Sequence, residues 1–203
     1  MFSRRRAAIV FVLGIAAAAQ LGAQPERFTR QEADRFQGKL LRIVEVGNRP
    51  SARAAQQQVT QLTDAEVTAF LRHHARDQVP VGIVDPTLIA LGEGRVGGRA
   101  VVDLDAVRAQ KQRGWLDPLS YMTGKLPLSA TGRLVTQAGV GRFQLESAEI
   151  SGVAVPKTLL QELLTYYSRT PDDPDGINMD DPFELPSRIR EIRVGKGEAT
   201  VIQ

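Results

Sequence analysis

Few residues in this chain have the types and spacing that catalysis or metal binding needs. Gly92, Gly94 and Gly97 form a GxGxxG pattern, which binds a dinucleotide only where a strand precedes it and a helix follows it. The residues after Gly97 alternate as in a strand, so the pattern predicts a glycine-rich hairpin. His73 and His74 are the only histidines, and neighbouring side chains on a helix diverge by about 100°. They therefore cannot bind one metal ion together.

An acidic stretch near the carboxyl end has some of the oxygen ligands of a calcium loop. Four polar side chains flank Gly176, namely Asp173, Asp175, Asn178 and Asp180. The glycine comes too early for an EF-hand, and the closing glutamate is missing. The whole loop, residues 170–184, holds six acids and no bases. We therefore expect a mobile, solvated loop with no cation nearby and no bound metal.

The usual residues of nucleophilic and metal-dependent catalysis are missing. The chain has no cysteine, and the patterns GxSxG, Ser-x-x-Lys and HExxH do not occur in it. Catalysis by carboxylates alone stays open, because such a pair meets only in the folded chain. We expect no catalytic residue and no cofactor, and so a protein that is not an enzyme.

Basic residues gather in the middle of the chain. Arg95 and Arg99 share the polar side of a predicted strand, and Arg72 and Arg76 share the polar side of a predicted helix. Three more bases follow the strand: Arg108, Lys111 and Arg113. Guanidinium groups bind phosphate well, so Arg95 and Arg99 are candidates for contact with lipid headgroups at a membrane surface. The alternative is a solvated polar surface.

The first 23 residues have the pattern of a secretory signal. Arg4, Arg5 and Arg6 precede an apolar run over residues 7–19, and small residues follow up to Ala23. The run is too short for a membrane span, which needs about 20 apolar residues. We expect cleavage after Ala23 and a periplasmic or secreted protein.

Cleavage would also change the charge balance. The chain has 26 basic and 23 acidic residues, and the signal contains three of the bases and no acid, which leaves 23 of each. The basic character thus belongs to the targeting segment, and we expect no binding to nucleic acid. An exported chain without cysteine has no disulfides, so its stability must come from burial.

Three amphipathic helices are predicted. Thr29 and Glu32 have the spacing of a capping box, which begins a helix over residues 25–46. A second capping box, Thr63 with Glu66, begins a helix that ends near Val79. Pro156 opens the third helix, whose apolar stripe contains Leu159, Leu160, Leu163 and Leu164.

Between the helices the apolar residues alternate, as in antiparallel strands with one buried face. A hairpin over 87–104 comes first, with Val96, Gly98, Ala100 and Val102 on one face. A loop with a short helix is expected over 106–122. A long strand over 125–137 follows, with Leu126, Leu128 and Leu134 on one face, and the chain returns over 142–150. A last hairpin pairs 188–194 with 198–202. Helices against a long, curved antiparallel meander predict an α+β fold.

We expect one such domain over residues 24–203. Its amino-terminal helix lies in 24–50 and its sheet-plus-helix core in 56–203. The order of elements in this core resembles the TULIP-like lipid-binding proteins of the bacterial envelope, which are related in architecture to the bactericidal permeability-increasing proteins. Three stretches carry the resemblance: Leu62-Thr63-Asp64-Ala65-Glu66-Val67, Gly152-Val153-Ala154-Val155-Pro156 before the leucine helix, and Glu184-Leu185-Pro186 before the last hairpin. The resemblance implies a helix cradled by a strongly curved sheet, with an apolar groove for acyl chains.

Two functions therefore remain. The first is an exported protein that binds a lipid or other amphiphile, with head-group contacts from Arg95 and Arg99. Its groove would be lined by Leu126, Leu128, Leu134, Leu159, Leu160, Leu163 and Leu164. The alternative is a structural or protein-interaction module of the cell envelope that has no small-molecule ligand.

Overall fold

The computed structural model describes residues 28–50, 57–110, 123–169 and 174–203. Its largest feature is a long antiparallel sheet with the strand order β2-β3-β4-β5-β6, a simple meander. The strands are β2 (Ile83–Gly92), β3 (Arg95–Asp103), β4 (Lys125–Gln137), β5 (Val140–Ile150) and β6 (Val153–Ala154). The predicted long strand over 125–137 is confirmed to the residue, and Ala138-Gly139 turns the chain because both adopt positive φ.

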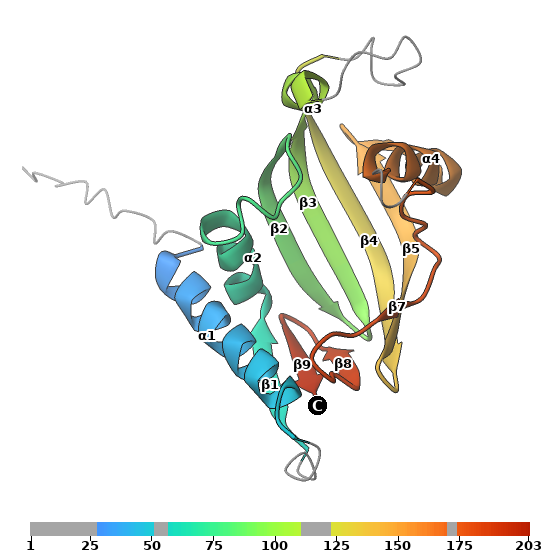
Figure 1. Ribbon diagram of the computed structural model, residues 1–203. Helices are drawn as coiled ribbons and strands as arrows, with labels where there is room; N and C mark the ends of the chain where they lie inside the picture. The colour runs from blue at the N-terminus through green and yellow to red at the C-terminus, as the bar shows by residue number, and fades with distance from the viewer. Residues whose placement is uncertain (1–27, 51–56, 111–122, 170–173) are drawn as a thin grey trace, which may run out of the picture.

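A small antiparallel sheet joins one end of the long one (Figure 1). It has the order β1-β9-β8, with β1 (Val59–Thr63), β8 (Glu191–Val194) and β9 (Glu198–Ile202), so the predicted last hairpin is confirmed. The short strand β7 (Phe183–Glu184) pairs with the start of β5. The Thr136 side chain of β4 bonds both backbone groups of Ile192 in β8, donating at 3.0 Å and accepting at 2.8 Å.

Both predicted capping boxes are present. Helix α1 (Arg30–Gly47) begins with Thr29 and Glu32, and α2 (Asp64–His73) begins with Thr63 and Glu66. Helix α2 ends earlier than the predicted Val79, because the amides of His74 and Ala75 both bond the carbonyl of Phe70 and close the last turn. Helix α4 (Lys157–Ser168) begins just after Pro156.

The segment after β3 differs from the expected strand end. Leu104, predicted to continue the strand, begins helix α3 (Leu104–Gln110) and is only 2% exposed. The rest of the predicted loop, residues 111–122, lies outside the described residues. None of the helices in the described residues is long and apolar enough to cross a membrane.

Helix α2 closes the free edge of β2. The Thr68 hydroxyl, which is fully buried, accepts from the Leu88 amide and donates to the Leu88 carbonyl, at 3.0 and 3.2 Å. Arg72 donates to the carbonyls of Pro86 and Asp85. These side chains bond backbone groups of β2 that a further strand would otherwise use. A sheet edge covered in this manner is protected from pairing with another chain.

The best-buried cluster of apolar side chains lies away from the centre of the long sheet. Ile43 of α1 packs there with three buried residues from the carboxyl-terminal part of the chain, Leu185, Ile189 and Val201. Leu62 and Ile192 are partly buried and pack against this cluster. Helix α1 is joined to α2 by the ring of Phe36 against Phe70, with centroids 4.9 Å apart. The α+β prediction is confirmed, and the main core sits under α1 and the small sheet.

Candidate functional site

The pairing register sorts the side chains of the long sheet onto two faces. Val96 pairs with Gly132, Ala100 with Leu128, and Val102 with Leu126. Because neighbours across an antiparallel pair point the same way, the two predicted apolar stripes lie on one face. The same face takes Phe143, Leu145, Ala148 and Ile150 from β5, and Ile83, Leu88 and Ala90 from β2. We call it the apolar face.

Two aromatic rings lie over glycines of the apolar face. The Phe143 ring occupies the space that a side chain at Gly132 would fill, and the Phe183 ring does the same at Gly141, 2.6 Å from an added Cβ. The strand pairing shifts by one residue between Thr131 and Gly132. Such a bulge bends the strand that carries the extra residue, which here is β5 at Glu146.

The apolar face is only partly covered. Leu126, Leu128 and Leu134, the predicted groove residues of β4, are all half-buried, as are Val102, Phe143 and Leu145. At Gly98, in the middle of this face, an added Cβ would meet no atom of the described residues within 4 Å. The described elements thus leave large apolar side chains accessible along the sheet.

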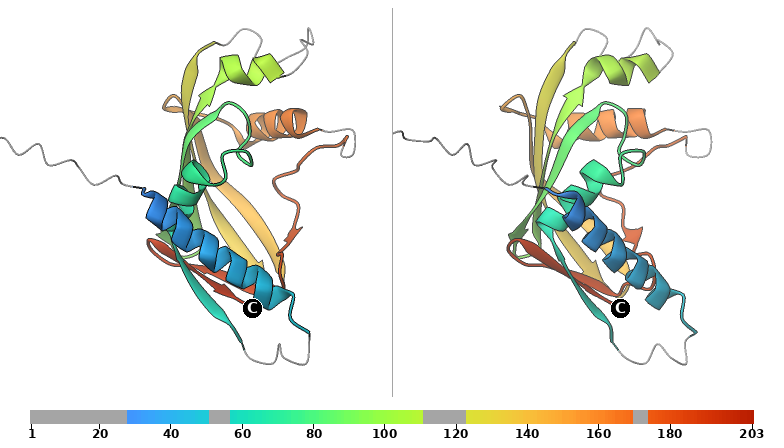
Figure 2. Two further views of the ribbon diagram at one scale, coloured as in Figure 1. Left: turned by 60° about the vertical axis from the view of Figure 1, so that its left-hand side comes forward. Right: turned by 90° about the vertical axis from the view of Figure 1, so that its left-hand side faces the viewer.

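Helices α3 and α4 lie on the concave side of the long sheet (Figure 2). Of the four predicted groove leucines on α4, Leu159 is 46% exposed and the other three are half-buried. Leu159 and Leu163 line a shallow hollow of about 330 Å³ together with Tyr166. Leu160 and Leu164 are not among the residues that line this hollow.

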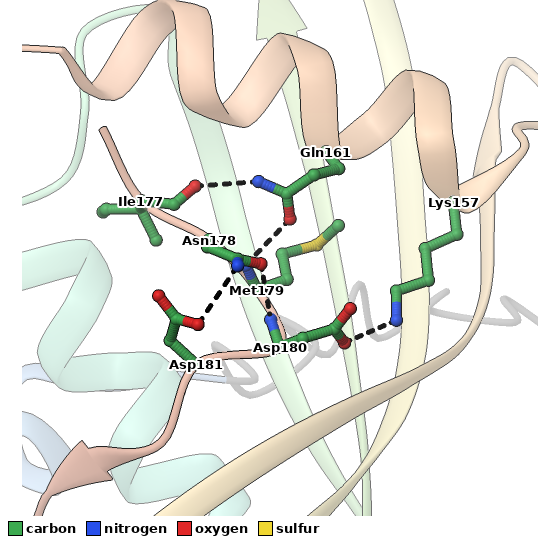
Figure 3. Close-up of polar contacts among 7 residues, drawn as sticks. All are labelled: Lys157, Gln161, Ile177, Asn178, Met179, Asp180 and Asp181. Atoms are coloured by element: carbon green, nitrogen blue, oxygen red, sulfur yellow. Dashed lines mark hydrogen bonds and ion pairs between the residues drawn. The ribbon is translucent and has the colours of Figure 1, made fainter. Parts of the chain in front are cut away.

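A segment that follows α4, residues 174–182, is tied to the helix by side-chain hydrogen bonds (Figure 3). We call it the strap. The Gln161 amide donates to the Ile177 carbonyl at 2.9 Å and accepts from the Met179 amide at 2.8 Å. Lys157 donates to Asp180 at 2.5 Å, so the prediction that this acidic loop has no cation nearby was wrong. The cation comes from the helix, 23 residues earlier in the chain.

Arg95 and Arg99 lie on the opposite face of the long sheet. Arg95 pairs with Arg133 and Arg99 with Ser129, and both partners alternate with the apolar-face residues of β4. Arg99 lines shallow hollows of about 260 and 250 Å³ together with Glu149. The strand register thus separates these two arginines from the predicted leucines of β4. Of the other predicted bases, Lys111 and Arg113 lie outside the described residues.

A pocket of about 700 Å³ was not predicted from the sequence. It lies where the carboxyl end of α2 meets the start of β2, and Leu71, Val79 and Ile83 form part of its wall. Arg72, on α2, and Arg76 also line it. The prediction that both share one side of a helix was wrong, because α2 ends at His73 and Arg76 lies in the following turn. The sequence signal was this pair of bases four residues apart. Its meeting with the start of β2 depends on tertiary structure.

The two histidines make separate contacts, as their spacing indicates. His73 Nε2 lies 2.9 Å from the Phe28 carbonyl, and His74 Nε2 lies 2.7 Å from Asp34 Oδ1. No group of three or more metal-ligating side chains occurs in the described parts of the chain, and Asp173 lies outside them. The GxGxxG glycines form the β2–β3 hairpin, where Gly92 and Gly94 adopt positive φ.

Among the carboxylates of the described residues, Glu66 is the most enclosed, with 7% exposed. Burial alone would raise the pKa of Glu66, but hydrogen bonds from Lys39 and Thr63 outweigh it and hold this pKa below its usual 4.5. Lys39 belongs to α1, and its Nζ lies 2.7 and 2.9 Å from the two carboxylate oxygens. Glu66 therefore joins α1 to α2 and caps α2, which is a structural role.

No protein-family model matches this chain, and no curated protein matches it. Among solved structures, the chain is similar to a lipopolysaccharide binding protein, with 15% sequence identity and a TM-score of 0.22. The match covers 71% of this chain and 40% of that one, so this chain spans less than half of its length. A TM-score of 0.22 does not establish a shared fold, and the resemblance to TULIP-like proteins stays a prediction.

Proposed function

We propose that this protein is exported and binds a lipid or other amphiphile, without catalysis, against the apolar face of its long sheet. The observation that carries the proposal is the contrast between the two apolar regions. The cluster under α1 is buried, with Ile43 4% and Val201 3% exposed. On the apolar face, by contrast, side chains such as Leu128 and Leu134 are only half-buried.

The energetics favour a ligand with an alkyl chain. Each methylene that leaves water contributes about 0.8 kcal/mol, so a chain of several methylenes binds usefully without any exact polar contact. A strand rises about 3.3 Å per residue, so the apolar row of β4 from Leu126 to Leu134 is roughly 26 Å long.

A second function is favoured by α1. Leu41 is 64% exposed, and Leu40 and Val44 near it are 37% and 40% exposed. Exposed apolar side chains grouped on a helix are typical of a surface that contacts another protein or a membrane. On this alternative the protein is an interaction module of the cell envelope without a small-molecule ligand.

The test starts from protein recovered from cells that express the whole chain. Amino-terminal sequencing should give a first residue at or near Gln24, and a retained Arg4-Arg5-Arg6 stretch would contradict export. The recovered protein should then bind a fluorescent fatty acid, and unlabelled fatty acid should displace the probe.

Substitutions at two adjacent residues of β4, one on each face, test which face of the strand binds the probe. Leu134→Gln places a polar group on the apolar face and should weaken probe binding about tenfold, the effect of losing one buried leucine contact. Val135→Gln, on the other face and 46% exposed, should leave binding unchanged. Circular dichroism shows whether both variants are folded. A folded wild type that binds no probe would leave the interaction module as the better proposal.

A further inference from the structure

The pocket between α2 and the start of β2 combines apolar walls with an excess of positive charge. Arg72 belongs to α2 and Arg76 to the turn that follows this helix, and both line the pocket. Asp85 is the acidic residue among the described side chains that line the pocket. Two guanidinium groups therefore face one carboxylate in a space of about 700 Å³, a size typical of small-molecule sites.

Within the described residues, Arg72 donates from Nε and Nη2 and Arg76 from Nε alone, so Arg76 keeps more donors for a ligand. Arg72 uses its guanidinium on the edge of β2, where it donates to Pro86, Asp85 and Thr87, and it lies 4.7 Å from the centre of the Phe28 ring. Arg76 donates its Nε–H to the Arg72 carbonyl at 2.5 Å. Its two Nη groups bond no other described residue. Arg76 is exposed at the rim of the pocket and is the cation that a ligand would meet.

The pocket borders the apolar face at Ile83. Ile83 lines the pocket and pairs across the sheet with Val102, which pairs in turn with Leu126. These three side chains form one cross-strand row on the apolar face. With strands about 4.8 Å apart, the row runs roughly 10 Å from the pocket to β4. An alkyl chain laid along it would bring its polar end to the pocket.

We infer that the pocket binds the anionic headgroup of the amphiphile, through Arg76, while the alkyl chain follows the row from Ile83 to Leu126. The inference rests on the proposed function and names its ligand class as anionic amphiphiles with a phosphate or carboxylate group. Charged hydrogen bonds from guanidinium to such oxygens are among the stronger polar contacts in proteins. The pocket thereby takes the role predicted for Arg95 and Arg99, which lie on the other face of the sheet.

The test compares two lysophospholipids with the same acyl chain, anionic lysophosphatidylglycerol and zwitterionic lysophosphatidylcholine. Each is titrated below its critical micelle concentration into the purified protein by isothermal calorimetry. The wild type should prefer the anionic lipid by about fivefold, the size of one exposed charged contact. Arg76→Gln should abolish this preference and leave the affinity for lysophosphatidylcholine unchanged. Arg76→Lys should keep most of it.

Arg99→Gln is the matched control, because it removes the same charge from the opposite face and should keep the preference. Unchanged melting temperatures would show that the variants are folded. An Arg76→Gln protein that still prefers the anionic lipid would overturn the inference while the proposed function stands. Inorganic phosphate that binds at Arg76 as tightly as the lipid would also overturn it, since the pocket would then be a free-anion site. Failure of both lipids to bind the wild type would reject the inference and the proposed function together.

Discussion

At Gly132 the absence of a side chain lets the Phe143 ring lie against the backbone of β4. Gly132→Ala should therefore push this ring away and lower the free energy of unfolding by about 1–3 kcal/mol, the usual cost of overpacking. Gly98 lies on the same face, in open space. Gly98→Ala should be neutral or slightly stabilising, because it restricts the unfolded chain. Urea denaturation measures both, and equal losses would mean that the ring is not held over Gly132.

Glu66 makes the stability of the α1–α2 pair depend on pH. Its pKa in the folded protein lies below the usual 4.5, so the ionised carboxylate stabilises the fold at neutral pH. That contribution is lost as the pH falls through 4.5 and then through the lower folded value. Glu66→Gln should cost about 1–2 kcal/mol at neutral pH and progressively less in acid.

The comparison requires urea denaturation of both proteins between about pH 7 and pH 3. Glu45→Gln is the control, because Glu45 is 71% exposed in its pair with Arg49 and such pairs contribute little. A difference between wild type and Glu66→Gln that stays constant over this range would show that the Lys39–Glu66 contact is not formed.

Among the elements, the strap depends on Gln161, which joins α4 to Ile177 and Met179 (Figure 3). Gln161→Ala removes both hydrogen bonds and should open the strap locally. We expect the Met179 amide to exchange with deuterium about tenfold faster, which corresponds to one or two hydrogen bonds.

Glu162→Ala, at the next residue of α4, is the control for a change in the helix itself. Its exchange rates at Met179 should equal those of the wild type. Equal rates in Gln161→Ala would mean that the strap is held by other contacts, such as Lys157 with Asp180.

In the molecule as a whole, the buried cluster of apolar side chains lies at the small sheet, while the large side chains on the apolar face of the long sheet stay partly accessible. The small sheet and α1 hold the buried cluster. The two sheets are joined by backbone hydrogen bonds from Gly94 to Val194 and from Gly139 to Arg190. Helix α2 closes the β2 edge through Thr68. This division lets the long sheet keep an accessible apolar face, because the fold does not rely on that face for its main core.

The local elements could be predicted from the sequence because each is encoded within a few residues. The capping box of Thr29 with Glu32 involves one helical turn, and the alternation over 125–137 reports a strand directly. Both are contacts or periodicities between near neighbours, which need no knowledge of the rest of the chain. The α+β class follows from the order of these elements.

The candidate site depended on contacts between distant segments. That Val96 and Gly132 share a face follows from the strand register, which local alternation leaves open. The same register separates Arg95 and Arg99 from the β4 leucines. Lys157 meets Asp180 only because the strap folds back along α4. The pocket of Arg76 exists because the end of α2 packs beside the start of β2. The sequence shows the type of each of these residues. Which residues they contact is decided by strand pairing and by the packing of distant segments.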